Sequence, residues 1–276
     1  MTSDRTRDTV AGDSAHRVAG DCAHRVAGDY DYEAGGSGYA QVRRTDPRIA
    51  AHVHAALGDA RTVINVGAGA GSYEPEDRQV TAVEPSAAMR AQRPAHLVKA
   101  IDAVAENLPF RDNSFDAAMA TITVHQWKDR IRGLREMQRV SRGPVVVLAL
   151  DPDLFSRFWL VDYIPEMVAV AKSRDPTTAQ LREELGGTTT ASLVPIPIDC
   201  VDGFAEAFYA RPEALLDPAV RQAQSAWGFI DPEVVDQSVQ RLRVDIETGE
   251  WDRKYGDLRG QPGYLGSLVL VVYHPD

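Results

Sequence analysis

Three glycines at every second position follow an apolar run in residues 63–72, Val-Ile-Asn-Val-Gly-Ala-Gly-Ala-Gly-Ser. Because glycine has no side chain, such a turn lets a ligand approach the bare backbone. If a helix follows the turn, its free N–H groups face the same spot. Glycine-rich turns also connect strands to helices without binding anything, so the neighbouring residues must decide between these two roles.

An acidic residue, Glu84, ends the next apolar stretch, seventeen positions after Gly67. A carboxylate there can accept hydrogen bonds from both hydroxyls of a ribose, although it could also be a solvated helix cap. NAD(P) and S-adenosylmethionine are the two ribose-bearing cofactors that compete. The dinucleotide fingerprint needs glycine or alanine three positions after its second glycine, where this chain has Ser72. The third glycine comes one position early, at Gly71, which favours S-adenosylmethionine.

The elements that must position these residues alternate in the βα manner. Helices are expected over 86–92 and 127–140, between short apolar strands. The expected strands are 62–66, 79–84, 96–101, 115–120, 144–150, 192–198 and 265–273. This pattern predicts an α/β fold, a Rossmann-like doubly wound sheet of seven strands, mostly parallel with the last strand antiparallel. Ligands of such sheets bind at the carboxyl ends of the strands.

The character of the sequence changes after Asp151, where several helices replace the alternation. We therefore expect a helical cap, inserted late in the chain over 152–258 and including the sixth strand. Before it lie a tail or arm over 1–29 and a cofactor-binding core over 30–151, and the last core strand falls within 259–276. Asp-Pro pairs at 46, 151, 175, 217 and 231 are expected to begin helices, with aspartate as the cap.

Several motifs in order give the core a family resemblance. The glycine turn is followed by Val-Glu-Pro-Ser at 83–86, Leu-Pro-Phe at 108–110, Asn-Ser-Phe-Asp at 113–116 and Leu-Arg-Glu-Met-Gln-Arg-Val at 134–140. In these motifs the chain resembles the class I S-adenosylmethionine-dependent methyltransferases, in particular the small-molecule type-11 group. The resemblance covers roughly residues 30–151. Beyond them, only the two closing strands follow the general plan.

The resemblance implies a role for each matching position. Gly67, Ala68 and Gly69 would pass beneath the methionine part of S-adenosylmethionine. The ribose hydroxyls would be held by Glu84, which Pro85 follows. The adenine would meet Asp102 and Ala103, and the sulfonium would face Thr121. The family often has an acidic residue where this chain has Asn65, so the contact to the methionine ammonium stays open.

Aromatic residues precede the core, and similar enzymes fold this segment over the cofactor. Tyr30, Tyr32 and Tyr39 could stabilise a sulfonium by cation–π attraction, worth roughly 0.5–2 kcal/mol each. Arg43 is a candidate to form a charged fork with the methionine carboxylate, or else is a surface arginine.

The acceptor side offers two candidate catalytic residues. His125 follows the fourth strand and could act as a general base, or it could pack or position the substrate. Asp199, with Asp202 nearby, could orient a polar acceptor or cap the next helix. Aromatic residues of the cap could enclose an apolar or aromatic acceptor, or form ordinary core. They are Phe155, Phe158, Trp159, Tyr163, Phe204, Phe208 and Trp227.

Bulk properties restrict the partners. The formal net charge of −10, with acidic and basic residues mixed, argues against nucleic-acid binding. No apolar segment is long enough to span a bilayer, and no signal-peptide core is present. Cys22 and Cys200 are interpreted as free thiols, and no metal-ligating cluster is apparent, so a cytoplasmic location without a metal is expected. A tandem eight-residue repeat over 11–26 could be a tolerated duplication or an arm that joins a homo-oligomer.

The function expected from these features is methyl transfer from S-adenosylmethionine to a small organic acceptor, as in secondary metabolism. Orienting the reactants can lower a barrier by about 7–11 kcal/mol, so an enzyme of this kind needs no strong base. An NAD(P)-dependent oxidoreductase and a non-catalytic cofactor-binding scaffold are the alternatives. The sequence sets neither the acceptor nor the atom that is methylated.

Overall fold

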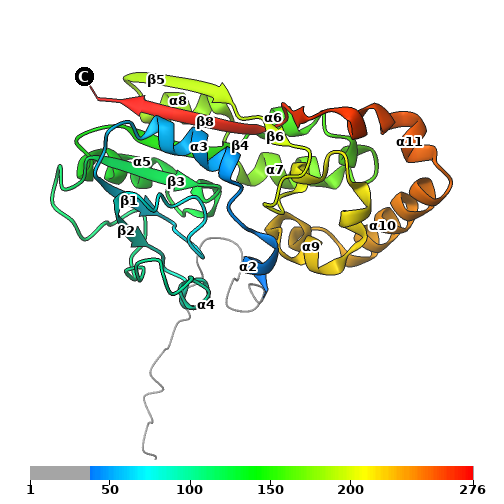
Figure 1. Cartoon of the computed structure of the whole chain (residues 1–276), viewed down its shortest axis with the longest axis horizontal. Coiled ribbons are helices and arrows are strands. Elements are labelled where there is room, and N and C mark those ends of the chain that lie inside the picture. The colour runs from blue at the N-terminus through cyan, green and yellow to red at the C-terminus, as the bar shows by residue number, and fades with distance from the viewer. Residues whose placement is uncertain (1–37, 276) are drawn as a thin grey trace, which may run out of the picture.

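A mixed β-sheet forms the centre of the computed structural model, which describes residues 38–275 (Figure 1). Within these residues the sheet has six strands, in the order β2-β1-β3-β4-β8-β5. The pairs β2–β1, β1–β3 and β3–β4 are parallel, whereas β8 is antiparallel to β4 and to β5. The strands are β1 (Thr62–Val66), β2 (Gln79–Val83), β3 (Ala117–Thr121), β4 (Val145–Leu150), β5 (Thr188–Leu193) and β8 (Leu268–His274). The predicted fold class, mostly parallel with an antiparallel last strand, is confirmed.

The strand order reverses at β1, which pairs with β2 on one side and with β3 on the other. Because these pairings are parallel, the carboxyl ends of all three strands meet at one edge of the sheet. A crevice outside such a reversal is where open α/β sheets bind ligands. The glycine turn, Glu84 and Thr121 all lie at this edge.

The third of the seven expected strands, over 96–101, does not form. A single parallel bridge, Val83 to Ile101, replaces it beside β2. Val98 and Ile101 remain 46% and 41% exposed. Because these apolar side chains stay largely in solvent, a strand here would gain little free energy from burying apolar surface, and a full edge strand does not form.

The strand expected over 192–198 divides at Pro195. Residues up to Leu193 belong to β5, whereas β6 (Ile196–Pro197) pairs with β7 (Gly263–Tyr264) in a separate two-stranded sheet. Proline has no N–H group to donate to a strand ladder, so Pro195 interrupts the pairing between β5 and β6.

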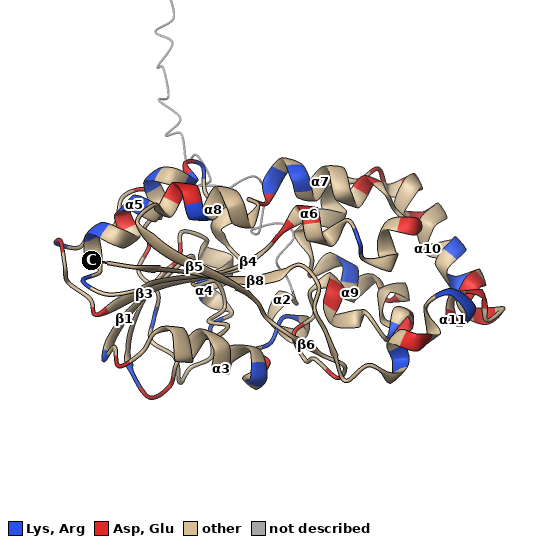
Figure 2. Cartoon of the chain, turned by 90° about the horizontal axis from the view of Figure 1, so that it is seen from above, with Lys and Arg blue, Asp and Glu red and all other residues tan. Residues whose placement is uncertain are grey.

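Helices cover both faces of the sheet, as Figure 2 shows with α3 on one side and α5 and α8 on the other. Alternate strand residues build two cores. Val63 and Met119 belong to the core on the α3 side, whereas Ile64 and Ala118 belong to the core on the side of α5 and α8. The helices of the first half are α2 (Tyr39–Val42), α3 (Pro47–Ala56), α4 (Ala87–Ala91), α5 (Arg130–Val140) and the 3₁₀ turn η1 (Val124–Gln126).

The remaining helices gather mainly beyond one end of the sheet, in the right half of Figure 1. Their aromatic side chains extend the core of the α3 side into this region. The exception is α8, which packs on β5 and β8. The α-helices are α6 (Pro152–Phe155), α7 (Glu166–Arg174), α8 (Thr178–Leu185), α9 (Pro218–Gln222), α10 (Pro232–Glu247) and α11 (Glu250–Tyr255). The 3₁₀ turns are η2 (Trp159–Asp162), η3 (Ala205–Phe208), η4 (Pro212–Leu216), η5 (Ser225–Phe229) and η6 (Gly256–Gly260).

Four of the five Asp-Pro pairs begin helices with an aspartate cap, namely those at 46, 151, 217 and 231. Asp175 instead ends α7, and Thr177 caps α8 in a capping box with Gln180. No helix in the described part of the chain is long and apolar enough to cross a membrane. The tail over 1–29, Cys22, Tyr30 and Tyr32 lie outside the described residues.

A carboxylic acid, Glu206, is buried where η3 meets the start of β8. It is 1% exposed and accepts hydrogen bonds from Ser267 N, at 2.9 Å, and from the Ser267 hydroxyl. Burial raises its pKa to about 7, while the bonds from Ser267 act in the opposite direction. Because folding raises this pKa, protonated Glu206 favours the folded state. This contribution to stability is complete at pH values below the pKa of the unfolded state and is lost as the pH rises through about 7.

Glu206→Gln is therefore expected to stabilise the protein relative to wild type at pH 8 more than at pH 5. The difference should be on the order of 3 kcal/mol, because the ionised carboxylate is the form that burial penalises. Urea unfolding of both proteins at the two pH values measures it. An equal difference at pH 5 and pH 8 would show that Glu206 does not titrate in this window.

Candidate functional site

The glycine turn leaves β1 with Gly67, Gly69 and Gly71 all at positive φ. A Cβ on Gly67 would lie 2.3 Å from Thr123 Oγ1, so only glycine lets the segment after β3 come this close. A helix does not follow the turn, contrary to what anion binding at a helix end would need. Residues 72–78 form turns that lead directly into β2. The turn must therefore be held by side chains from elsewhere.

A cavity of about 670 Å³ opens beside the glycine turn, at the carboxyl ends of β1, β2 and β3. Nine of the ten predicted cofactor-binding residues line it: Tyr39, Gly67, Ala68, Gly69, Glu84, Pro85, Asp102, Ala103 and Thr121. Other polar side chains in its wall were not predicted as site residues, among them Asn107, Gln126, Lys128 and Arg132. They lie in loops, in η1 and at the start of α5, where apolar periodicity carries no information.

Glu84 connects β2 to the glycine turn. The residue is 6% exposed, and its two carboxylate oxygens accept hydrogen bonds from Gly69 N at 2.9 Å and from Ser86 N at 2.8 Å. Burial raises its pKa, and the two backbone bonds counteract part of this effect. Each carboxylate oxygen has a further lone pair, so Glu84 can still accept hydroxyl donors from a ligand in the cavity.

Asp102 stands on the neighbouring segment, after the bridge at Ile101. The Glu84 N–H donates to Ile101 O at 3.0 Å, which fixes the two acidic residues side by side at the sheet edge. Asp102 is half-exposed and forms an ion pair with Arg90 at 3.3 Å. The cavity wall therefore contains two carboxylates on adjacent segments, of which Glu84 is buried and Asp102 is half-exposed.

The far wall is the turn that leaves β3 at Thr121. Ile122 adopts a φ of 49°, which is strained for a β-branched residue, and its N–H donates to Leu148 O at 2.7 Å. Such strain is common at binding sites. The side chain of Ile122 lines the cavity and also packs against the core on the α3 side.

A buried ion pair supports the glycine turn from below. Arg93 Nη2 donates to both carboxylate oxygens of Glu74, at 2.8 and 2.9 Å, and Arg93 Nη1 donates to Gly69 O at 3.3 Å. Asn65 Nδ2 donates to Glu74 Oε1 at 3.0 Å. The side chain at position 65 therefore contacts a carboxylate, that of Glu74, instead of carrying one. Nothing in the sequence around Glu74 marks it, because residues 72–78 have no helical or strand periodicity.

Arg43, the tenth predicted cofactor-binding residue, does not line the cavity. Its guanidinium forms an ion pair with buried Asp202, with Arg43 Nε 2.6 Å from Asp202 Oδ1. Asp202 raises the pKa of Arg43 further above its ordinary value, against the opposing effect of burial. The Arg43 guanidinium, which we expected to bind the carboxylate of the cofactor, thus binds the carboxylate of Asp202.

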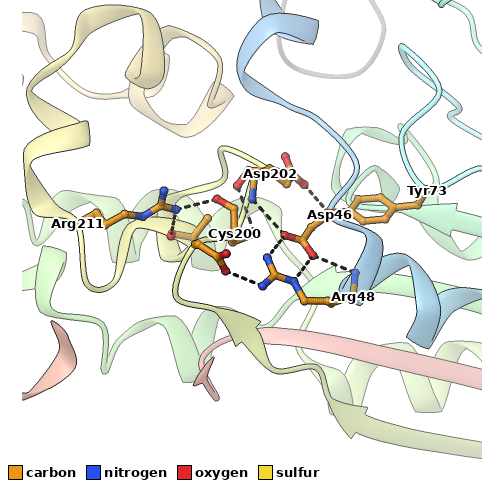
Figure 3. A network of polar contacts seen from close by, with 9 residues as sticks. Asp46, Arg48, Tyr73, Cys200, Asp202 and Arg211 are labelled. Atoms are coloured by element: carbon orange, nitrogen blue, oxygen red, sulfur yellow. Dashed lines mark hydrogen bonds and ion pairs between the residues drawn. The ribbon is translucent and has the colours of Figure 1, made fainter. Parts of the chain in front are cut away.

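Neither predicted catalytic residue reaches the cavity. His125 lies in η1, and its Nδ1 is 3.3 Å from Asp175 Oδ1 at the end of α7. Asp199 is 74% exposed and pairs with Arg48, whose Nε and Nη2 also donate to Asp46 (Figure 3). The Arg48 hydrogen bond lowers the pKa of Asp199, which therefore remains ionised. Both side chains pair with other residues of the protein, and neither is among the residues that line the cavity.

The cap aromatics that we considered for an acceptor pocket are core residues. All seven are buried, none lines the cavity, and rings such as Phe158, Trp159 and Tyr163 pack on one another. Among the described residues, no cluster of His, Cys, Asp and Glu could hold a metal ion. What the cavity can do chemically is bind a ligand rich in hydroxyl groups against bare backbone.

Known proteins are similar to this chain in sequence and in fold. Residues 64–148 match a family model described as a methyltransferase domain. A solved structure of a putative methyltransferase from an antibiotic biosynthesis pathway of Anabaena variabilis ATCC 29413 is 30% identical. Its similarity covers 86% of this chain and 100% of that chain, with a TM-score of 0.79.

Two curated proteins match over a shorter region. Both are described as ubiquinone/menaquinone biosynthesis C-methyltransferase UbiE, one from Geobacter sp. (strain M21) and one from Citrifermentans bemidjiense. Each is 34% identical over 25% of this chain, and the chain spans 40% of the length of each. The structure of YcgJ from Bacillus subtilis, 16% identical with a TM-score of 0.50, shares the fold.

Proposed function

The chain belongs to the class I S-adenosylmethionine-dependent methyltransferases, and from this premise we propose that it transfers the methyl group of S-adenosylmethionine to a small organic acceptor. The observation that carries this proposal is the cavity, which brings the glycine turn, Glu84, Asp102 and Thr121 together at the strand ends. The cofactor would supply an electrophilic methyl group on a positively charged sulfur.

The residues of the cavity suit this cofactor. Glu84 would accept the ribose hydroxyls, Asp102 and Ala103 would face the adenine, and the glycine turn would pass beneath the methionine chain. Asn65 Oδ1 is buried and has no hydrogen-bond partner within the described residues. Asn65 is 0% exposed and is not among the residues that line the cavity, so no contact to the methionine ammonium is proposed for it.

The contribution of the protein to the reaction would be orientation and exclusion of water. His125 and Asp199 lie away from the cavity, so neither is proposed as a base. Thr121 and the strained turn at Ile122 form the wall where an acceptor would meet the methyl group. Holding two reactants in line is worth about 7–11 kcal/mol, more than one acid–base residue usually provides.

A small organic acceptor is supported by the relative of similar length, which is described as belonging to an antibiotic biosynthesis pathway. Secondary metabolism is the corresponding proposal for this chain. The matches to the two quinone-biosynthesis enzymes cover only a quarter of this chain, so they support the cofactor more than the acceptor. The net charge of −10 agrees with a substrate other than nucleic acid.

A ligand comparison separates this proposal from a nicotinamide enzyme. At a hundred times its dissociation constant, S-adenosylhomocysteine should stabilise the folded protein by about 2.7 kcal/mol, which raises Tm by roughly 5–10 °C. NADH at the same concentration should leave Tm unchanged. A shift with NADH alone would favour the oxidoreductase, and no shift with either would contradict the cofactor site. Transfer of labelled methyl groups to a metabolite extract then distinguishes an enzyme from a cofactor-binding scaffold.

A further inference from the structure

A buried aspartate joins three distant segments next to the cavity. Asp202 Oδ1 accepts from Arg43 Nε at 2.6 Å, and Asp202 Oδ2 accepts from the Tyr73 hydroxyl at 2.6 Å and from Arg43 Nη2 at 3.4 Å. The Asp202 side chain is 1% exposed. Arg43 lies between α2 and α3, Tyr73 follows the glycine turn, and Asp202 follows β6. Figure 3 shows Asp202 between the loop of Cys200 and the segments of Asp46 and Tyr73.

The segment from α2 to α3 is held against the Asp202 loop by its backbone as well. Gly203 N donates to Val42 O at 3.1 Å, and Val201 N donates to Asp46 Oδ2 at 3.2 Å. A Cβ on Gly203 would lie 2.3 Å from Val42 Cγ1, so this contact requires glycine. The loop itself is secured by Arg211, which donates to Cys200 O at 2.7 Å (Figure 3).

Tyr73 extends the connection to the glycine turn. It adopts a φ of 64°, and its N–H donates to Thr45 Oγ1 at 2.9 Å. Burial, and the charge of Asp202 to a smaller extent, raise the pKa of the Tyr73 phenol well above its ordinary value. The phenol therefore stays protonated at neutral pH and donates to Asp202.

Tyr39, at the start of α2, is the cavity residue that these contacts reach. Arg43 N donates to Tyr39 O at 2.8 Å, and the Arg43 guanidinium carbon lies 5.4 Å from the centre of the Tyr39 ring. The carboxylate of Asp202 thus fixes the arginine that backs the Tyr39 ring, and through Tyr73 it also fixes the end of the glycine turn.

We propose that Asp202 is a positioning residue for cofactor binding, acting through Arg43 on Tyr39 and through Tyr73 on the glycine turn. The inference rests on the proposed function, because it assigns Asp202 a role in holding the cavity wall against S-adenosylmethionine. This role also explains why Arg43 pairs with Asp202 inside the protein. Arg43 then supports the Tyr39 ring and does not bind the cofactor itself.

Calorimetric titration with S-adenosylmethionine tests this role, because its positively charged sulfur is the group that the Tyr39 ring would contact. Asp202→Asn should weaken binding about tenfold and Tyr73→Phe about threefold, within the range that one aromatic contact to a cation provides. The matched controls are Asp245→Asn and Tyr163→Phe, which break a tyrosine–aspartate hydrogen bond of 2.8 Å away from the cavity. Both controls should bind as wild type does.

A merely structural Asp202 would lower Tm without changing the affinity of the folded protein, so each Tm is measured alongside. In a Tyr39→Ala background, Asp202→Asn should lose the part of its effect that acts through Arg43 and keep the roughly threefold part that acts through Tyr73. If both Asp202→Asn and Tyr73→Phe fold and bind with wild-type affinity, the role proposed for Asp202 is wrong, whereas the proposed function is unaffected. If Asp202→Asn does not fold, the affinity of Tyr73→Phe decides. Failure of the wild-type protein to bind would overturn the proposed function, and this inference with it.

Discussion

Arg93→Met is expected to lower the free energy of unfolding by about 3–5 kcal/mol, which corresponds to a fall in Tm of roughly 6–20 °C. The exposed fractions of the Arg93 and Glu74 side chains are 3% and 1%, so the substitution leaves a carboxylate buried without its cation. Gly69 O also loses a donor, and the glycine turn should loosen. Chemical and thermal unfolding of the apoprotein measure the effect.

Two further variants show whether burial is the cause. Lys172→Met breaks an ion pair with Asp153 in which both side chains are more than half exposed, and should cost less than about 1 kcal/mol. The double substitution Glu74→Gln and Arg93→Met leaves no buried charge, so it should be more stable than Arg93→Met alone. If Arg93→Met cost no more than Lys172→Met, the glycine turn would not depend on this pair.

The second large effect is expected on ligand binding. Glu84→Ala should weaken S-adenosylhomocysteine binding at least tenfold, because hydrogen bonds to a charged group contribute roughly 1.5–3 kcal/mol each. Glu84→Gln keeps one acceptor oxygen and the side-chain size, and should have an intermediate effect. Glu76→Ala removes a carboxylate whose side chain is 82% exposed and serves as the control. Calorimetric titration measures all three.

Since Glu84 also accepts from Gly69 N and Ser86 N, the melting curves of the apoproteins are needed beside the affinities. A folded Glu84→Ala variant with unchanged affinity would remove this residue from the site. Because burial raises the pKa of Glu84, acidification should weaken binding at a higher pH than for an ordinary glutamate.

The parts of the fold that the sequence predicted well are those with a local signal. The apolar run before Gly67 and the Leu, Met and Val residues of α5 have clear periodicity, and four Asp-Pro pairs begin helices as expected. The segment 96–101 has similar residue types, but it lies at the edge of the sheet with solvent on its outer side. A strand does not form there because of this edge position, which cannot be read from the sequence.

The candidate site followed the same division. Residues tied to strand ends, such as Glu84 and Thr121, lie at the cavity because strand order and direction place them there. His125 and Asp199 sit in a 3₁₀ turn and a loop, where one residue changes the direction of a side chain. Arg43 is directed by Asp202, which is 159 positions away and carries no sequence signal for that pairing.

The structure of the complex with S-adenosylhomocysteine tests the central claim most directly. The account predicts the ribose hydroxyls within hydrogen-bond distance of the Glu84 carboxylate, the adenine beside Asp102 and Ala103, and the sulfur facing Thr121. Electron density for the ligand outside the 670 Å³ cavity, or a ribose turned away from Glu84, would contradict it.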